Sequence, residues 1–501
     1  MKTNTLDFDA QALREKILDL AMRGKLVPQD PNDEPASVLL EKIKVEKEQL
    51  IKEKKIKKSK PLVPITDDEK PFDIPDSWEW VRLGDLFDIT SSKRVMKSEW
   101  KDTGIPFYRA REIVSIKNHR PLKDPIFIDK KTYEGKIKIS GKPNINDILL
   151  TGVGTLGVPY IVDNDKKFYF KDGNIIWLKN LINLNPKFIS YVVQSPYMLK
   201  KINNGRGTTV ATLTIVRSNN LLIPLPPLEE QSRIAAKIAQ LFALLRKVES
   251  STQQYAKLQT LLKSKVLDLA MRGKLVKQDP HDEPASVLLE KIKAEKEQLV
   301  KEGKIKKSKP LPPITDDEKP FDIPDNWEWG RLGDVTTLGN FYSINPQDIQ
   351  YGENLIELAD IESGTGKLIK QETVNGTVGS SKYRYFKGNV LFSKLRPYLR
   401  KVLLAPNTGV CTTELLPIDG IKIDNYFLYY SFLSDFFFKQ IEKEMHGVNL
   451  PRVNPKKLSE IVIPIPPVLE QERICNEISH LLFLLHKSKK NNKRYFTNTK
   501  S

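Results

Sequence analysis

Hydrophobic residues recur at helical spacing through the middle of the chain. They follow a near-heptad spacing of four and three positions: Ile234, Ile238, Leu241, Leu245, Val248, Tyr255, Leu258, Leu262, Val266 and Leu269. This stripe predicts one long helix over residues 229–272, about 65 Å long at about 1.5 Å per residue. A stripe of this kind is typical of a helix that packs against another helix, as in a coiled coil.

The two ends of the chain carry the same stripe in two pieces. The first half of the central helix is matched by Ile474, Ile478, Leu481 and Leu485, and the second half by Leu13, Ile17 and Leu20. The two ends together would therefore rebuild one copy of the central helix. We predict two long antiparallel helices in a cyclic, pseudo-twofold arrangement with the termini close together.

The stripe belongs to a large internal repeat. Residues 17–85 return as residues 266–334 without a gap and with nine mismatches, at an offset of 249 positions, the difference between 17 and 266. A shorter repeat, 219–245 and 459–485, closes each copy. A repeat of this length is the duplication of a whole module, because solenoid repeats have periods of about 20–50 residues.

We call these repeated segments the frame. Between them lie two inserts, residues 86–220 and 335–458, with little obvious similarity to each other. The first insert alternates short β-like runs, at 104–114, 147–154 and 158–163, with a helical segment at 185–202. The second has a strand and turn at 388–405 and an aromatic helix at 425–445, whose aromatic side chains we expect in a core. Each insert is thus predicted to be a mixed α/β domain.

Within each frame, the first copy predicts a helix over 7–24 that ends at Gly24, where a left-handed residue fits. A second helix over 37–53 has a lysine-rich end, which is either a solvated face, the favoured interpretation, or an arm that contacts phosphates. The proline-rich residues 61–80 are expected to be an extended connector anchored by Trp78 and Trp80.

These elements define an α+β fold with two mixed domains separated by the frame helices. The predicted borders are a helical region and connector at 1–75, a first domain at 76–226, the central helices and connector at 227–324, a second domain at 325–466 and a closing helix at 467–501.

The formal charge of +18 and the pI near 9.4 indicate a polyanionic partner, although lysine-rich helices alone also give such a charge. Two cysteines form neither a disulfide framework nor a zinc site by themselves, and they fit a reducing cytoplasm. No apolar signal segment follows Lys2, and no run of about 20 apolar residues predicts a membrane span.

The segments that resemble catalytic or nucleotide-binding motifs lack the neighbouring residues that such motifs need. GVGTLG at 152–157 matches a dinucleotide fingerprint, but Pro159 follows where a helix would have to begin, so we interpret it as a turn. GTGK at 364–367 lacks the spacing and the hydroxyl residue of a phosphate loop. The five histidines show no metal-ligand spacing, and no methyltransferase or hydrolase motif is present. The pattern is that of a binding protein.

Basic and hydroxyl residues gather in the insert loops, where they suit phosphates and base edges. In the first insert, the candidates for contact with nucleic acid are Lys93, Arg94, Arg109, Arg111, Thr151, Thr155, Arg206, Thr208 and Thr209, with Ser91 and Ser92 beside them. In the second, they are Lys382, Tyr383, Arg384, Lys394, Arg396, Tyr398, Arg400, Lys401 and Arg452, with Ser393 beside them. For any one of these residues, a surface charge or internal ion pair is the alternative.

The frame resembles the specificity subunits of type I restriction-modification systems. The resemblance rests on GKLVPQDPNDEPAS, the IPDSWEW segment, PLPPLEEQSRI and GNVLFSKLRPYLRK, and it covers nearly the whole chain. It implies two target-recognition domains that each read one half of a bipartite DNA sequence, with the repeated helices as a spacer that binds two methyltransferase subunits. Restriction subunits would complete the complex.

The resemblance also implies that this chain holds no cofactor of its own, and that S-adenosylmethionine, ATP and magnesium bind to partner subunits. Two alternatives are also compatible with the sequence. One is a stand-alone or inhibitory DNA-binding protein of the same type, and the other is a scaffold whose inserts bind protein.

Overall fold

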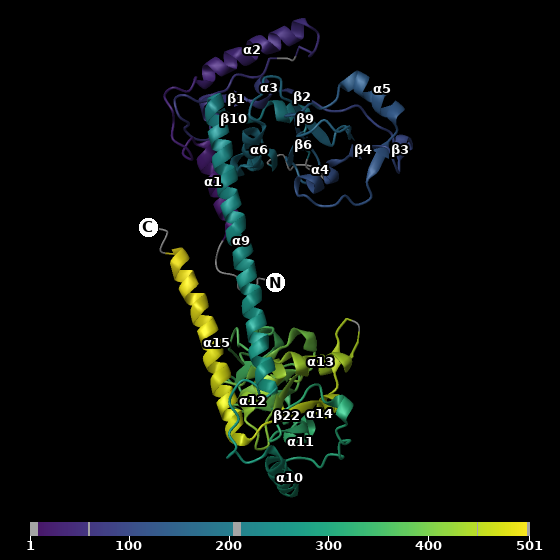
Figure 1. Ribbon diagram of the computed structural model, residues 1–501, viewed down its shortest axis with the longest axis vertical. Coiled ribbons are helices and arrows are strands. Elements are labelled where there is room, and N and C mark those ends of the chain that lie inside the picture. Colours follow the sequence, from purple (N-terminus) through teal and green to yellow (C-terminus); the bar gives the residue numbers. More distant parts are fainter. Residues whose placement is uncertain (1–8, 59–60, 204–211, 448, 498–501) are drawn as a thin grey trace. The chain divides into compact units, whose positions relative to one another are not determined.

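The computed structural model describes residues 9–58, 61–203, 212–447 and 449–497. The chain forms two compact units, which divide between Ser251 and Thr252. We call them the N-terminal unit, up to Ser251, and the C-terminal unit, from Thr252. Helix α9, Leu228–Met271, is continuous over 44 residues and gives its first part to one unit and its second part to the other (Figure 1). The predicted central helix is therefore confirmed.

The helices of the N-terminal unit are α1 (Ala10–Met22), α2 (Ala36–Lys52), α3 (Leu83–Leu86), α4 (Ala110–Lys117), α5 (Lys130–Ser140), α6 (Pro186–Gln194), α7 (Pro196–Asn203) and α8 (Ile215–Asn219), with short turns η1 (Asp67–Glu69) and η2 (Lys97–Glu99). Its strands are β1 (Glu79–Arg82), β2 (Asp88–Thr90), β3 (Trp100–Lys101), β4 (Ile105–Tyr108), β5 (Ile126–Ile128), β6 (Ile148–Thr151), β7 (Pro159–Ile161), β8 (Tyr169–Phe170), β9 (Ile175–Lys179) and β10 (Leu222–Leu225).

The helices of the C-terminal unit are α10 (Ala285–Lys301), α11 (Leu332–Val335), α12 (Asn425–Leu433), α13 (Asp435–Lys443), α14 (Pro455–Glu460) and α15 (Val468–Thr497), with turns η3 (Asp316–Glu318), η4 (Pro346–Asp348), η5 (Leu358–Asp360) and η6 (Pro397–Leu399). Its strands are β11 (Glu328–Arg331), β12 (Ser343–Ile344), β13 (Asn354–Ile356), β14 (Glu372–Thr373), β15 (Lys382–Tyr385), β16 (Val390–Ser393), β17 (Val402–Leu404), β18 (Gly409–Thr412), β19 (Leu415–Ile418), β20 (Met445–His446), β21 (Arg452–Val453) and β22 (Val462–Ile465).

The repeated frame folds alike in both units. The segment that enters each insert pairs with the segment that leaves it, β1 with β10 and β11 with β22, as antiparallel two-stranded ribbons. Gly24 ends α1 with a φ of 66°, and a β-carbon there would lie 2.3 Å from the ring of Pro75. The left-handed residue expected at this helix end is present, and its glycine also allows the connector to approach closely.

In each unit, the frame helices share a hydrophobic core with the insert. Leu18, Ala21 and Met22 of α1 are buried in the core of the N-terminal unit together with Ile234 and Ile238 of α9. In the C-terminal unit, the second half of α9 shares a core with Ile474 and Ile478 of α15.

Of the other positions predicted for helix packing, Leu245 is buried, while Ile17, Leu20, Leu241, Val266, Leu269, Leu481 and Leu485 are half-buried. Leu13, Leu258 and Leu262 correct the prediction, because 41%, 51% and 49% of their surfaces are exposed. Leu13 and Leu262 occupy the same place in the repeat, one to two turns before the residues that face the core.

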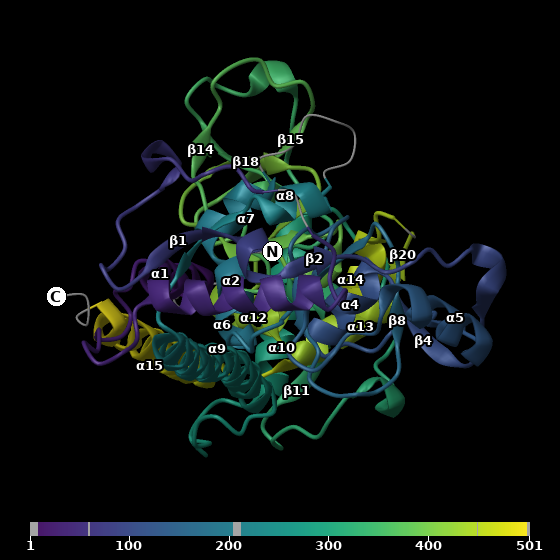
Figure 2. The same ribbon diagram turned by 90° about the horizontal axis from the view of Figure 1, so that it is seen from above.

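Each insert has a central sheet next to the frame and a second sheet farther out in its own unit. The N-terminal unit contains the sheets β2-β9-β6-β7 and β3-β5-β4-β8, and α5 lies beside the second one (Figures 1 and 2). The C-terminal unit contains the sheet β17-β16-β19 and the five-stranded sheet β12-β15-β18-β13-β14. The mixed α/β character predicted for both inserts is confirmed.

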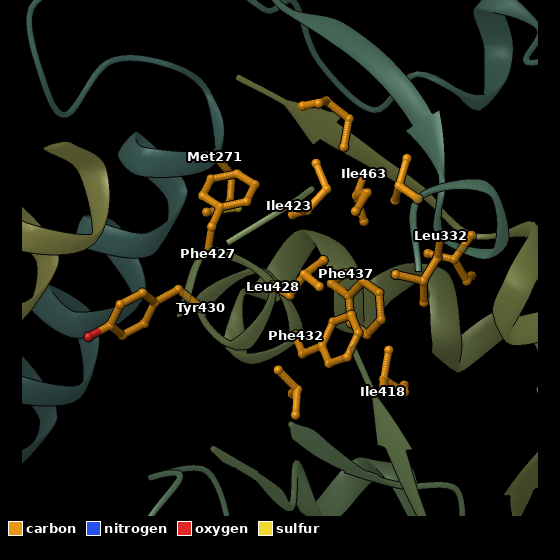
Figure 3. Close-up of a cluster of buried hydrophobic side chains, with 14 of the residues drawn as sticks. Met271, Leu332, Ile418, Ile423, Phe427, Leu428, Tyr430, Phe432, Phe437 and Ile463 are labelled. Carbon is orange, nitrogen blue, oxygen red and sulfur yellow. The ribbon is translucent and has the colours of Figure 1, made fainter. Parts of the chain in front are cut away.

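The aromatic segment of the second insert is core, as expected, but it is two helices instead of one. The core around α12 and α13 includes Phe427, Phe432 and Phe437, which are 0–2% exposed (Figure 3). Ser434 separates the helices with extended backbone, and its hydroxyl accepts a hydrogen bond from Phe437 N at 3.4 Å as the cap of α13.

Two predicted elements of the first insert are also corrected. The helical segment 185–202 breaks at Ser195 into α6 and α7. Residues 104–114 are a strand only as far as Tyr108 and continue as helix α4, because Glu112 accepts a hydrogen bond from the amide of Arg109 and caps a helix there.

Within the described residues, every helix is too short or too polar to span a bilayer.

Candidate nucleic-acid interface

The two inserts carry the same β-hairpin, although their sequences do not reveal it. In the first, β6 and β7 flank residues 152–157, and in the second, β16 and β17 flank residues 394–400. We call these segments the first and second reading tips. β6 also pairs with β9 and β16 with β19 in the same register, so Thr151 corresponds to Ser393.

Matching backbone hydrogen bonds hold both tips. Gly152 N donates to Asn174 O at 2.7 Å, and Lys394 N donates to Glu414 O at 3.0 Å. A later segment then pairs with each tip, through the bridge Val153–Thr212 in the first and Leu395–Arg452 in the second. Thr212 and Arg452 therefore lie beside equivalent hairpins.

The tips also bend at the same two places. Gly154 and Gly157 have φ values of 71° and 70°, and the matching Arg396 and Arg400 both have φ of 49°. A left-handed conformation costs a residue with a side chain about 1–2 kcal/mol, whereas glycine adopts it readily. Non-glycine residues in such conformations concentrate at functional sites, so the arginine side chains of the second tip are the first candidates for a function.

Three side chains of the second tip are available to a ligand. Arg396 and Tyr398 are exposed and Lys394 is half-exposed, and none of the three has a side-chain hydrogen bond or ion pair within the described part of the chain. Amide hydrogen bonds from Arg396 to Pro451 O at 2.7 Å and from Leu399 to Arg396 O at 2.9 Å hold the backbone that carries them. This is a fixed, cationic loop with one aromatic ring.

The remaining candidates around this tip are engaged internally. Arg400 forms an ion pair with Asp435 at 2.5 Å, and Arg452 forms one with Glu414 at 3.2 Å. Lys401 donates to Leu358 O, and burial lowers the pKa of its amine. Ser393 is buried, and its hydroxyl donates to Leu395 O at 2.7 Å.

The cluster on β15 is mainly structural. Lys382 is 8% exposed, 3.7 Å from Glu357, and Arg384 forms an ion pair with Glu353. The ring of Tyr383 lies 5.1 Å from that of Phe341. Alternating residues of a strand point to opposite faces, and the sequence alone does not show which face is covered.

In the first insert, Lys93, Arg94 and Thr155 are exposed, and their side chains have no partner among the described residues. The segment that carries Lys93 is fixed beside the sheet, because the hydroxyls of Ser91 and Ser92 donate to Ile175 O and Phe170 O at 2.7 and 2.6 Å. Ile175 pairs with Thr151 at the base of the first tip, so these residues share one end of the sheet.

In the same insert, Thr151 corrects the prediction, and Arg109 and Arg111 are engaged in ion pairs. Thr151 is fully buried, and its hydroxyl joins Thr155 O and Val158 N inside the hairpin. Arg109 and Arg111 both bond to the buried Glu112, each at 2.6 Å. Burial alone would raise the pKa of Glu112, but the two guanidinium groups and the Arg109 amide hold it below its usual value. Arg206, Thr208 and Thr209 lie outside the described residues.

The described residues contain no group of three or more His, Cys, Asp and Glu side chains that could hold a metal ion. Two features of the site were not foreseen from the sequence. They are the buried carboxylate of Glu112 and the contact of Arg400 with Asp435, since neither pairing follows a spacing that one sequence reveals.

Comparison with known proteins places this geometry in context. Residues 75–259 and 324–493 match the type I restriction modification DNA specificity domain. The chain is 32% identical to the specificity subunit of the type I restriction enzyme EcoAI of Escherichia coli, over 96% of this chain and 90% of that protein. It is 35% identical to the EcoEI specificity subunit of the same organism, over 66% of this chain and 62% of that one.

A solved structure concerned with complex assembly and conformational transition of the type I restriction-modification system matches with a TM-score of 0.52. That alignment covers 86% of this chain and 97% of the other, at 19% identity. This likeness supports the fold.

Proposed function

Because the chain belongs to the family of type I restriction-modification DNA specificity subunits, we propose that it recognises a two-part DNA sequence, one part with each insert. The observation that carries the proposal is that one frame, present twice, holds two reading tips with the same backbone bends and different side chains. A constant support with variable tips suits a protein that reads two different short sequences.

The second tip supplies the donors for direct reading of bases. Arg396 suits the O6 and N7 atoms of guanine, which a guanidinium contacts with two hydrogen bonds. Lys394 suits a phosphate, and the ring of Tyr398 suits the sugar-phosphate backbone or a thymine methyl group. The backbone bonds of the tip hold these groups in place before DNA arrives, which limits the entropy lost on binding.

The first tip offers a different surface. Its glycines let the backbone approach DNA closely, and Thr155 adds a hydroxyl that can donate or accept. Lys93 and Arg94, at the same end of the sheet, supply positive charge for phosphates. The overall charge of +18 supports attraction to DNA over a longer range.

Helix α9 serves in this proposal as a spacer that sets the gap between the two half-sites, as geometry sets half-site spacing in dimeric DNA-binding proteins. The frame helices would also bind two methyltransferase subunits, which restriction subunits join. S-adenosylmethionine, ATP and magnesium would be held by those partners in the cytoplasm, and this chain would contribute recognition without catalysis.

The test is selection of duplexes from a random DNA library by the full complex of this chain with its methyltransferase subunits. We expect enrichment of two short sequence blocks at a fixed separation, and an affinity that falls steeply as salt rises, because phosphate contacts release counterions. Enrichment by this chain alone, without methyltransferase, would favour the stand-alone DNA-binding alternative. No enrichment, with salt-independent binding of a protein, would favour the scaffold.

A further inference from the structure

The side chain of Arg400 turns away from the second reading tip and binds the body of its own unit. Its guanidinium forms the 2.5 Å ion pair with Asp435, and its central carbon lies 4.2 Å from the centre of the Phe438 ring. Both partners belong to α13. Only 31% of the Arg400 side chain is exposed, so much of its surface is used in these contacts.

Asp435 connects this contact to helix α9. One carboxylate oxygen accepts from Arg400, and the other accepts a hydrogen bond from the hydroxyl of Ser264, in the part of α9 that belongs to the C-terminal unit. Burial would raise the pKa of Asp435, but the bonds from Ser264 and Arg400 outweigh it and hold the pKa below its usual value. The carboxylate is therefore charged at neutral pH and accepts both bonds.

The N-terminal unit lacks this connection at the equivalent place. Gly157 stands where Arg400 stands, and Pro196, after the matching break at Ser195, stands where Asp435 stands. A β-carbon on Gly157 would lie 2.8 Å from the Cδ1 atom of Ile202, so that tip contacts α7 through its bare backbone. The second tip instead keeps an arginine in a left-handed conformation, at a cost of about 1–2 kcal/mol.

We propose that Arg400, Asp435 and Ser264 form a strut that holds the second reading tip to the spacer helix. Arg400 is then a positioning residue: it sets the direction in which Lys394, Arg396 and Tyr398 point and does not itself contact DNA. The consequence for recognition rests on the proposed function, whereas the strut itself can be tested without DNA.

The first experiment measures amide hydrogen exchange in the complex of the full chain with its methyltransferase subunits, in the absence of DNA. In the Arg400→Ala and Asp435→Ala variants, amides of residues 394–401 should exchange about tenfold faster. Ser264→Ala should do the same to a smaller degree, and Asp435→Asn, which keeps the acceptor oxygen, should fall between Asp435→Ala and the unaltered chain. The first tip, residues 152–157, should not change. Unaltered exchange at 394–401 in all four variants would overturn the strut.

The second experiment is a double-mutant cycle on affinity for the selected DNA. Arg400→Ala and Asp435→Ala should each weaken binding about tenfold, and the double variant should be no weaker, because each change removes the same contact. Lys457→Ala is the matched control, since it breaks the 2.8 Å surface ion pair with Glu460 on α14 and should leave affinity unchanged.

The cycle separates positioning from direct contact. If Arg400 bound DNA itself, removal of Asp435 would free it, so Asp435→Ala would bind as tightly as the unaltered complex or more tightly. That result, or additive losses in the double variant, would overturn the proposal. A complex that shows no sequence preference at all would contradict the proposed function, while the exchange experiment would still decide whether the strut exists.

Discussion

The indole N–H of Trp78 donates a hydrogen bond of 2.8 Å to the buried carboxylate of Glu230, a residue 152 positions later in the chain. Gln29 donates to the other oxygen of the same carboxylate at 2.7 Å. The second copy repeats both bonds, from Trp327 and Gln278 to Glu470, at 2.9 and 2.6 Å. This contact joins the loop after α1, the connector and the start of α9, and it explains why these segments return together in the repeat.

Loss of this donor should destabilise the frame. Trp78→Phe leaves one oxygen of a fully buried carboxylate without its partner, which costs about 1–3 kcal/mol in addition to the lost packing. Trp80→Phe is the control, because Trp80 is also buried, in contact with Phe72 at 5.0 Å between ring centres, and donates no hydrogen bond within the described residues. Urea unfolding should give the larger loss for Trp78→Phe, and equal losses would contradict this role of Glu230.

The same carboxylates should make stability depend on pH. Burial raises the pKa of both Glu230 and Glu470, and the nearby Asp33 and Asp282 raise it further. The hydrogen bonds to each carboxyl group and the nearby Arg233 and Arg473 lower the pKa, but by less, so the net shift is upward. A carboxyl group with a raised pKa in the folded chain contributes stability fully below its unfolded pKa of about 4.3. That contribution is lost as the pH rises through the folded pKa.

The Glu230→Gln/Glu470→Gln variant should therefore lose less stability than the unaltered chain as the pH rises from 4 to 8. Unfolding midpoints measured across this range provide the test. If the unfolding midpoint changed equally with pH in the two proteins, the pKa values of Glu230 and Glu470 would not differ between the folded and unfolded chain.

Arg396→Gly should separate stability from recognition. Glycine removes the left-handed strain of about 1–2 kcal/mol but loses more chain entropy on folding, about 0.5–1 kcal/mol, so the free energy of unfolding should stay equal or rise by up to about 1.5 kcal/mol. DNA affinity should fall by about 1–3 kcal/mol if Arg396 contacts a guanine, with relaxed specificity at one base position. Unchanged affinity and sequence preference would remove Arg396 from the reading surface.

The two threonines of the first insert should behave oppositely. Thr151→Val keeps the shape but leaves Thr155 O and Val158 N without the hydroxyl, and should destabilise the hairpin by about 1–3 kcal/mol. Thr155→Val should leave stability unchanged, because the Thr155 hydroxyl has no partner in the described structure, and should alter recognition of the first half-site. Thermal unfolding and duplex selection on each variant distinguish the two roles, and the reverse outcome would mean that the wrong threonine faces DNA.

The elements that could be predicted from the sequence are those marked by a local residue pattern or by the internal repeat. The central helix followed from a stripe such as Ile234 and Ile238, and the anchoring tryptophans followed from proline-rich surroundings. The structural likeness of the two inserts was missed because it consists of backbone hydrogen bonds, such as Gly152 to Asn174 and Lys394 to Glu414. Many different side chains are compatible with the same backbone hydrogen bonds, so the two sequences need not resemble each other. Within the candidate site, residues without an internal partner, such as Arg396, were found together with ion-paired ones such as Arg109, because charge alone does not show where a partner lies.

The length of α9 should set the gap between half-sites in the proposed complex. An insertion of seven helix-forming residues after Ser251, where the two units divide, lengthens the helix by about 10 Å, or about three base pairs at about 3.4 Å each. The selected DNA should keep both sequence blocks and change only their separation. A fixed separation would contradict the spacer role.

The central claim is that each insert reads one half of a split target. The most direct measurement is a map of modified bases across the genome of cells that carry this chain with its methyltransferase subunits, compared with cells that lack only this chain. We predict a modified motif made of two short blocks around a fixed unspecified gap, present only with the chain. A map that does not depend on this chain, or a single undivided motif, would contradict the account.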